Sequence, residues 1–292
     1  MHITQSQEWA DFKKSTGVAP VKLESGSYVY FSPVPRLPFT IGYCPRPETL
    51  NMEELFSAGK QHHSVFIKVD PNLIIDSSLS TVDCRPSTAV LPQHTFILDL
   101  TPTESEILKG MDEKTRYNIK IAQKHGVIIR KASSLNDIQV FCDLQRETAK
   151  RQRFRVKPDC YFLSMWEQLH PKNLMEVLIA EYEGKSIAAI ALLFYQDTMY
   201  YAYGGSAEIH RETMPNYLLH YEAIKIGRER KMKNYDLWGA YKLSPEEKDP
   251  WFGIYRFKKG FGGQLLTYPQ SFDIIFHPLF YFAYQLFSKR IH

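Results

Sequence analysis

The sequence predicts a mixed α/β fold made of two similar halves, and three observations support this class. The chain has 292 residues, too many for one ordinary small domain and enough for two. Hydrophobic residues make up 44% and charged residues 23%, which is the composition of a globular protein with a sizeable core. Segments with strand and helix periodicity alternate along the chain, and this alternation occurs twice.

The first hundred residues alternate weakly between the two periodicities. Trp9 and Phe12 mark the inward face of a short amphipathic helix over 6–14, and Gly17 ends it. A proline-rich connection follows the first two strands. We expect strands at 21–23, 28–31, 39–43, 64–69 and 95–100, and a second helix at 52–62.

The rest of the chain carries stronger signals. Thr103 caps a helix whose first turn holds Glu104 and Glu106, where carboxylates complement the helix dipole. We then expect helices at 114–125, 135–151, 159–169 and 216–231, a final helix from Pro278, a hairpin of 175–182 with 186–194, and strands at 127–130, 198–203 and 235–237.

That order of elements is typical of an acyltransferase-like mixed sheet, and we expect two related α/β halves. The first should comprise residues 1–95 joined by a C-terminal segment, 270–292. The second should comprise residues 96–269.

Composition excludes several classes of protein. The four cysteines are far apart and lack metal-ligand spacing, which argues against zinc and suits a reducing cytosol. No secretory signal begins the sequence, and no apolar run approaches the roughly 20 residues that a membrane span needs. A net charge of +4 permits an anionic partner without requiring one.

Several catalytic motifs are also absent. The chain has no GxxxxGK, no strand-linked GxGxxG and no GxSxG. His62 and His63 are not followed by a suitably placed aspartate, and the pyrophosphate loop of acetyl-CoA-dependent acetyltransferases is missing. An acyltransferase-like order without that loop implies a donor other than coenzyme A. We expect no cofactor.

One stretch, residues 251–263, combines four aromatic residues, three cations and four glycines. Such a stretch suits a charged, partly planar substrate such as a nucleotide, because glycines allow close approach and aromatics form walls. The alternative is a buried strand that ends in a glycine turn. Strand alternation would send Lys258 and Lys259 to opposite faces, so only one of them can serve a site.

Other candidate residues are scattered. Tyr201 and Tyr203 should share one face of a strand and offer a stacking surface, or pack across the sheet. Cations between 151 and 157 suit phosphate binding, or form a solvated loop. Asp70, at a strand exit, is either a general base or a turn former.

Taken together, these pieces resemble the Fem family of tRNA-dependent peptidoglycan aminoacyltransferases. The matching landmarks cover nearly the whole chain in order. They are 9–13 (WADFK), 43–46 (YCPR), 68–71 (KVDP), 98–100 (LDL), 114–116 (KTR) with Gly126, 157–161 (KPDCY), 201–206 (YAYGGS), 235–239 (YDLWG) and 257–258 (FK).

The resemblance implies two acetyltransferase (GNAT)-like subdomains with a cleft between them. It also implies an enzyme that transfers an amino acid from aminoacyl-tRNA to a nucleotide-linked or lipid-linked muropeptide. It implies that Lys258, beside Phe257, stabilises the reaction centre or holds the tRNA end. The residues implied to contact the muropeptide are Lys13, Lys157, Tyr161, Tyr201 and Tyr203, with Asp70 a base candidate on which the family does not depend.

The chain departs from the family pattern in three ways. Lys157 stands where an arginine is common in the family, so a guanidinium that could bind a phosphate through two hydrogen bonds is replaced by a single ammonium charge. Pro47 replaces a glycine that is common after Pro-Arg. The coiled-coil arm of larger members is missing, so the chain resembles the short form.

Two rival functions remain at this stage. One is an N-acyltransferase with another donor, such as an acylated carrier protein, and the other is a non-catalytic tRNA- or muropeptide-binding protein. The aromatic terminal segment 280–290 either touches a membrane surface or packs on the first subdomain.

Overall fold

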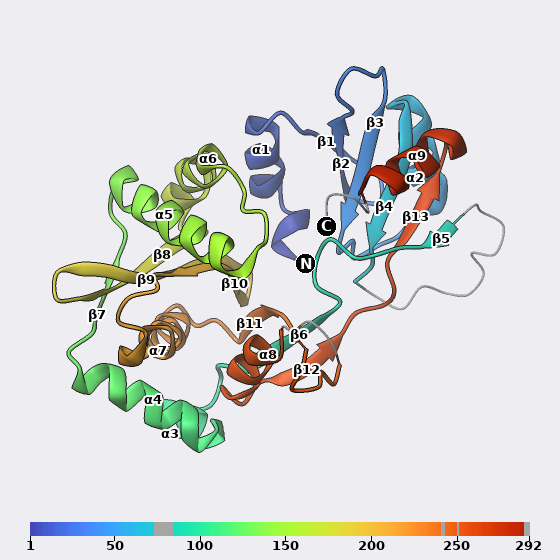
Figure 1. The fold of residues 1–292 in the computed structure, drawn as a ribbon. Helices are drawn as coiled ribbons and strands as arrows, with labels where there is room; N and C mark the ends of the chain where they lie inside the picture. Colours follow the sequence, from blue (N-terminus) through green and yellow to red (C-terminus); the bar gives the residue numbers. More distant parts are fainter. Residues whose placement is uncertain (73–83, 241–242, 250, 289–292) are drawn as a thin grey trace. The chain divides into compact units, whose positions relative to one another are not determined.

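The computed structural model describes residues 1–72, 84–240, 243–249 and 251–288. The chain divides into two compact units, Met1–Gln93 with Thr267–His292 and His94–Leu266. Each unit contains a mixed sheet with helices against it (Figure 1). The predicted α/β class is therefore confirmed.

The first unit is built on a sheet in the order β1-β2-β3-β4-β13-β5. All its neighbouring strands are antiparallel except β3 and β4, which are parallel. The strands are β1 (Ala19–Lys22), β2 (Tyr28–Pro33), β3 (Thr40–Pro45), β4 (Ser64–Asp70), β5 (Cys84–Pro86) and β13 (Phe272–Ile275).

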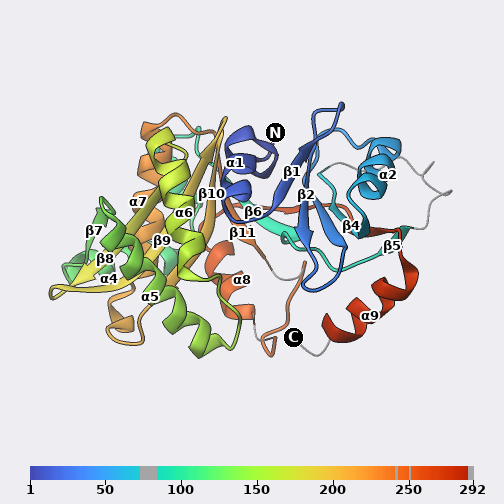
Figure 2. The same cartoon turned by 90° about the horizontal axis from the view of Figure 1, so that it is seen from above.

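Helices α1 (Gln7–Ser15), α2 (Met52–Gln61) and α9 (Pro278–Ser288) belong to this unit, after a short 3-10 turn, η1 (Ile3–Gln5). Ser6 begins α1 by accepting a hydrogen bond from the Trp9 backbone N–H at 3.1 Å. Helices α2 and α9 lie on opposite faces of the sheet (Figure 2). Alternating residues of β4 explain this, because Ile67 packs toward α2 and Phe66 toward α9.

The second unit has a longer sheet in the order β12-β6-β11-β10-β9-β8-β7. Its strands are β6 (His94–Asp99), β7 (Ile128–Lys131), β8 (Met175–Tyr182), β9 (Lys185–Tyr195), β10 (Thr198–Ser206), β11 (Asn234–Gly239) and β12 (Gln264–Thr267, whose last residue falls at the unit boundary). Strand β10 is parallel to β11 and antiparallel to β9.

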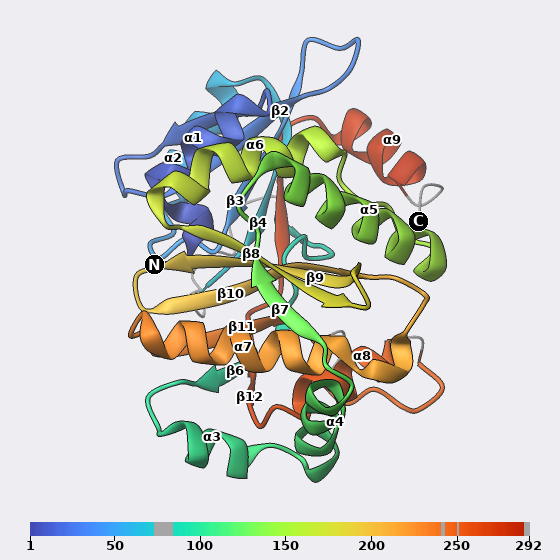
Figure 3. The ribbon, with the colours of Figure 1, turned by 90° about the vertical axis from the view of Figure 1, so that its left-hand side faces the viewer.

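Helices cover both faces of this sheet, with α5 and α6 on one side and α7 with α4 on the other (Figure 3). Thr103 and Ser134 begin α3 and α5 with capping boxes, which satisfy backbone donors at both helix starts. The helices are α3 (Glu104–Gly110), α4 (Glu113–Lys124), α5 (Leu135–Gln152), α6 (Asp159–Leu169), α7 (Pro215–Glu229) and α8 (Phe252–Lys259), with 3-10 turns η3 (His170–Lys172) and η4 (Arg211–Thr213).

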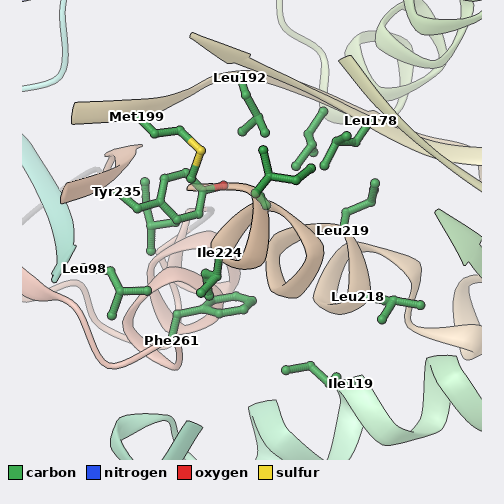
Figure 4. Close-up of a cluster of buried hydrophobic side chains, with 14 of the residues drawn as sticks. Leu98, Ile119, Leu178, Leu192, Met199, Leu218, Leu219, Ile224, Tyr235 and Phe261 are labelled. Carbon is green, nitrogen blue, oxygen red and sulfur yellow. The ribbon is translucent and has the colours of Figure 1, made fainter. Parts of the chain in front are cut away.

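The core of the second unit lies between the sheet and α7. Leu192 and Met199 project from the sheet toward α7, which carries Leu219, and Ile224 of the same helix lies beside Phe261 (Figure 4). No helix in the described part of the chain is long and apolar enough to cross a membrane.

The strand interpretation of residues 251–263 is wrong. Phe252–Lys259 forms the helix α8, and its inward positions recur at i, i+3 and i+4: Ile254, Phe257 and Lys258. The buried Phe261 follows just after the helix end. The glycines flank the helix more than they interrupt it. Gly262, for example, adopts a left-handed φ of +85° after the helix, where an added Cβ would lie 2.4 Å from the Gly110 carbonyl oxygen.

Candidate active site

The candidate site begins where two neighbouring strands of the second sheet, β10 and β11, stop pairing with each other. Strand β10 pairs with β9 over its whole length but with β11 only over Thr198–Tyr200. Beyond that point β11 continues beside β6 as far as Gly239. The carbonyl group of Gly239 therefore lies in a segment of β11 that is no longer paired with β10.

The amino group of Lys258 reaches this segment of β11 from α8. Its Nζ donates a hydrogen bond to the Gly239 carbonyl oxygen at 2.9 Å and lies 5.2 Å from the centre of the Tyr201 ring. The side chain is only 7% exposed. Burial lowers the pKa of Lys258 to about 8, against the opposing effect of the Asp236 carboxylate.

Lys258 is thus a buried cation at neutral pH, with hydrogen-bonding capacity to spare. Among the residues that the structure describes, Gly239 supplies the one hydrogen-bond acceptor of this amino group. An ammonium has three donors, so two are available to an oxygen atom of a ligand. The adjacent Lys259 is exposed, because successive helical residues point about 100° apart.

Aromatic side chains surround Lys258. The Phe257 ring lies 4.9 Å from Tyr217 and 5.3 Å from His220, and the Tyr201 ring lies 4.5 Å from His220. Such edge-to-face contacts fix the rings in place. Phe257 consequently holds α8, and with it the backbone of Lys258, against α7.

His220 is a buried residue at this site that the sequence analysis missed. Its Nδ1 is hydrogen-bonded to the Tyr235 hydroxyl at 2.8 Å. Burial lowers the pKa of His220 to about 3, and the nearby Lys258 charge acts in the same direction, so the imidazole is neutral. A histidine on the apolar face of the predicted helix 216–231 was the available signal.

Asp236 is an acidic residue whose charge acts on Lys258. Its carboxylate accepts hydrogen bonds from the Thr95 hydroxyl and from the Trp238 backbone N–H, the latter at 2.7 Å. Trp238 adopts a left-handed φ of 59°, and its carbonyl oxygen lies 3.0 Å from the same Thr95 hydroxyl, whose single proton the two acceptors share. This network holds β11 in an unusual backbone conformation one residue before Gly239.

The expectation that Tyr201 and Tyr203 share one face of their strand is wrong. Tyr201 lies opposite Leu192 and Tyr203 opposite Ala191, so Ala202 is an extra residue in β10. This β-bulge reverses the alternation. The Tyr201 ring therefore lies on the α7 face of the sheet and the Tyr203 ring on the α6 face.

Two glycines after the bulge leave room for neighbouring groups on the two faces of the sheet. A Cβ on Gly204 would lie 2.1 Å from the Tyr201 hydroxyl, so this ring occupies the space above the glycine. A Cβ on Gly205 would lie 2.5 Å from the Leu144 backbone carbon, so the missing side chain lets α5 approach the sheet.

Tyr203, Tyr161 and Lys157 form a second group. The two tyrosine hydroxyls are hydrogen-bonded at 3.4 Å, and the exposed Lys157 places its Nζ 5.6 Å from the centre of the Tyr161 ring. Burial raises the pKa of both tyrosines, so their hydroxyls remain donors. Among the predicted phosphate-binding cations, Arg151 instead donates to the Ser206 carbonyl oxygen at 3.1 Å and supports the end of β10.

The two remaining predicted residues lie in the first unit. Lys13 is half-buried on α1, with its Nζ 5.8 Å from the centre of the Phe12 ring. Asp70 is fully buried at the end of β4. Its carboxylate accepts bonds from the Tyr43 hydroxyl at 2.6 Å, the Leu91 N–H at 2.7 Å and the Ser271 hydroxyl at 2.7 Å. These bonds use its accepting capacity and make Asp70 an anchor for the surrounding loops.

A model of the FemAB family matches residues 79–185 and 170–289 of this sequence, and the chain belongs to that family. Similar curated proteins are the lipid II:glycine glycyltransferases of Staphylococcus epidermidis and Staphylococcus aureus. Both are 21% identical to it over 99% of this chain and 91% of their own length. The alignments span 382 and 387 positions, so these relatives carry internal segments that the shorter chain lacks.

Solved structures agree with this family at the level of the fold. The crystal structure of FemX matches with a TM-score of 0.82 at 19% identity, covering 97% of this chain and 94% of that one. The structure of L-PGS from Bacillus licheniformis matches with a TM-score of 0.58 at 10% identity, covering 94% of this chain and 89% of that one.

Proposed function

We propose that this chain transfers an amino acid from aminoacyl-tRNA to the stem-peptide amine of a peptidoglycan precursor. Membership of the FemAB family and similarity to lipid II:glycine glycyltransferases support aminoacyl transfer to a peptidoglycan precursor. Transfer RNA as the donor is our inference. Two features of the sequence support it. The order of strands and helices is acyltransferase-like but lacks the coenzyme A loop, and the sequence landmarks resemble those of the tRNA-dependent Fem family.

The proposed reaction needs alignment and charge stabilisation more than a nucleophilic side chain. The acceptor amine bonds to the carbonyl carbon of the aminoacyl ester, and a tetrahedral oxyanion forms. The ester C–O bond then breaks, the amine loses a proton, and the ribose oxygen leaves as a hydroxyl. Alignment of two substrates can supply roughly 7–11 kcal/mol of the barrier reduction.

The observation that carries the proposal is the buried ammonium group of Lys258. Its Nζ is fixed by Gly239 at 2.9 Å and still has donors for an oxyanion. A cation in a buried, aromatic environment stabilises developing negative charge more strongly than the same cation in water. We assign Lys258 this role and assign Phe257 the role of positioning it.

We further propose that the precursor is bound by Lys13, Lys157, Tyr161, Tyr201 and Tyr203. The tyrosine pair of Tyr161 and Tyr203, next to the exposed cation of Lys157, offers neutral donors and a positive charge to a phosphorylated ligand. Tyr201 contributes through its contact with Lys258. Asp70 is assigned a structural role because its carboxylate already accepts bonds from Tyr43, Ser271 and the backbone N–H groups of Val90 and Leu91.

The test is incubation with a pool of charged tRNAs and either a nucleotide-linked or a lipid-linked muropeptide. The expected result is release of free tRNA that depends on the muropeptide, with a muropeptide mass increased by one aminoacyl residue. Transfer from an acylated carrier protein alone would contradict the tRNA donor. Binding of both substrates without any product would contradict catalysis.

A further inference from the structure

Helix α9 presents apolar side chains on two opposite faces, and only one of them packs on the protein. On the inner face, the Tyr281 hydroxyl donates to the Asp273 carboxylate at 2.9 Å. The Phe66 ring lies 5.2 Å from Tyr281 and 5.0 Å from Tyr284. These contacts fix the helix on the sheet of the first unit and so fix which face points away from it.

The outer face is a continuous apolar stripe. Leu279, Phe282 and Leu286 recur at i, i+3 and i+7, which places them side by side. Their exposed fractions are 85%, 65% and 53%. No charged residue occurs between 278 and 288, although the water-facing side of a surface helix is normally polar.

We propose that this stripe, Leu279, Phe282 and Leu286, lies on the surface of an anionic phospholipid bilayer. The helix has 11 residues, too few to span a membrane but enough to lie in the interface with one face buried. In the sequence, Lys289 and Arg290 directly follow α9, and cations there are attracted to anionic head groups.

The test is co-sedimentation of the whole chain with vesicles of phosphatidylglycerol and phosphatidylcholine. The variant Phe282→Glu with Leu286→Glu should bind such vesicles roughly tenfold or more weakly, because its carboxylates resist entry into the acyl boundary. The matched control is Ile128→Glu with Leu266→Glu. It makes the same charge change at two exposed apolar residues on strands β7 and β12, and should bind like wild type.

A second variant leaves the stripe intact. Lys289→Glu with Arg290→Glu should reduce binding to phosphatidylglycerol vesicles at low salt, and pure phosphatidylcholine vesicles should bind wild type more weakly. Circular dichroism and thermal unfolding establish that each variant folds.

Three results would overturn the proposal. They are absence of wild-type sedimentation at low salt, an equal loss in the Ile128/Leu266 control, and a lipid-independent dimer that the α9 substitutions dissociate. Vesicle binding is measured without transfer, so this proposal and the transfer reaction stand or fall separately.

Discussion

Replacing Lys258 by methionine tests the candidate site most directly, because the side chain keeps its approximate length and loses its charge and donors. Removal of one oxyanion donor typically costs about a hundredfold to a thousandfold in turnover, or roughly 3–4 kcal/mol. We therefore expect Lys258→Met to lose nearly all transfer from charged tRNA while keeping its affinity for the muropeptide. Lys259→Met is the matched control, because Lys259 is the exposed neighbour on the same helix.

The assay is single-turnover transfer from labelled aminoacyl-tRNA at saturating muropeptide, with muropeptide affinity measured by calorimetry. Circular dichroism checks the fold of both variants. Near-normal transfer by Lys258→Met would refute the assignment, as would a Lys259→Met protein that folds and does not turn over.

The pH dependence gives an independent check on Lys258. Burial lowers its pKa from 10.5 to about 8, so between these values the unfolded chain binds more protons than the folded chain. Stability from this group therefore rises with pH across that window. The unfolding free energy of wild type minus that of Lys258→Met should therefore increase by roughly 3 kcal/mol from pH 8 to 10.5.

Catalysis should show the opposite trend, because the proposed role needs the charged ammonium. The single-turnover rate should fall as pH rises through about 8. Denaturant titrations at several pH values measure the stability difference. If the stability difference between wild type and Lys258→Met does not change with pH, the charge of Lys258 is not buried. If the transfer rate rises through pH 8, the neutral amine of Lys258 is the active form.

Three further predictions concern other parts of the chain. Lys13→Ala with Lys157→Ala should weaken calorimetric binding of a nucleotide-linked muropeptide by about 1.5–3 kcal/mol per charged hydrogen bond lost, and unchanged affinity would contradict their role. Asp70→Asn should lower the unfolding free energy by about 1–3 kcal/mol, because an amide group faces several donors, while transfer by the folded protein persists. Gly205→Ala should cost about 1–3 kcal/mol in thermal unfolding, because its Cβ would lie 2.5 Å from the α5 backbone. Gly253→Ala, which meets open space on α8, should instead gain up to about 1 kcal/mol, and an equal loss in both variants would contradict this reasoning.

The sequence determined most of the secondary structure, because periodicity and caps are local signals. The helix 159–169 was predicted with its observed bounds, and the caps at Thr103 and the stop near Gly126 fall where expected. The short strands β5, β12 and β13 were missed, whereas the equally short β1 and β7 were predicted with shifted bounds, so three or four residues are too few for reliable recognition by periodicity.

The helix α8 could have been recognised and was not. Its inward residues repeat at i, i+3 and i+4, but the density of glycine favoured a strand and turn interpretation. Gly253 is tolerated because its position on the helix is exposed, and Gly260 lies just after the helix end.

Only the tertiary structure decided the geometry of the candidate site. The sequence alone supplied Lys258, Tyr201 and Tyr203 as candidates, but an inserted residue in a strand leaves no trace in its own alternation. The bulge at Ala202 is defined by the pairing of β10 with β9, and it places Tyr201 and Tyr203 on opposite faces of the sheet. Likewise, the lowered pKa of Lys258 comes from burial by segments far apart in the chain, so no local pattern could have shown it.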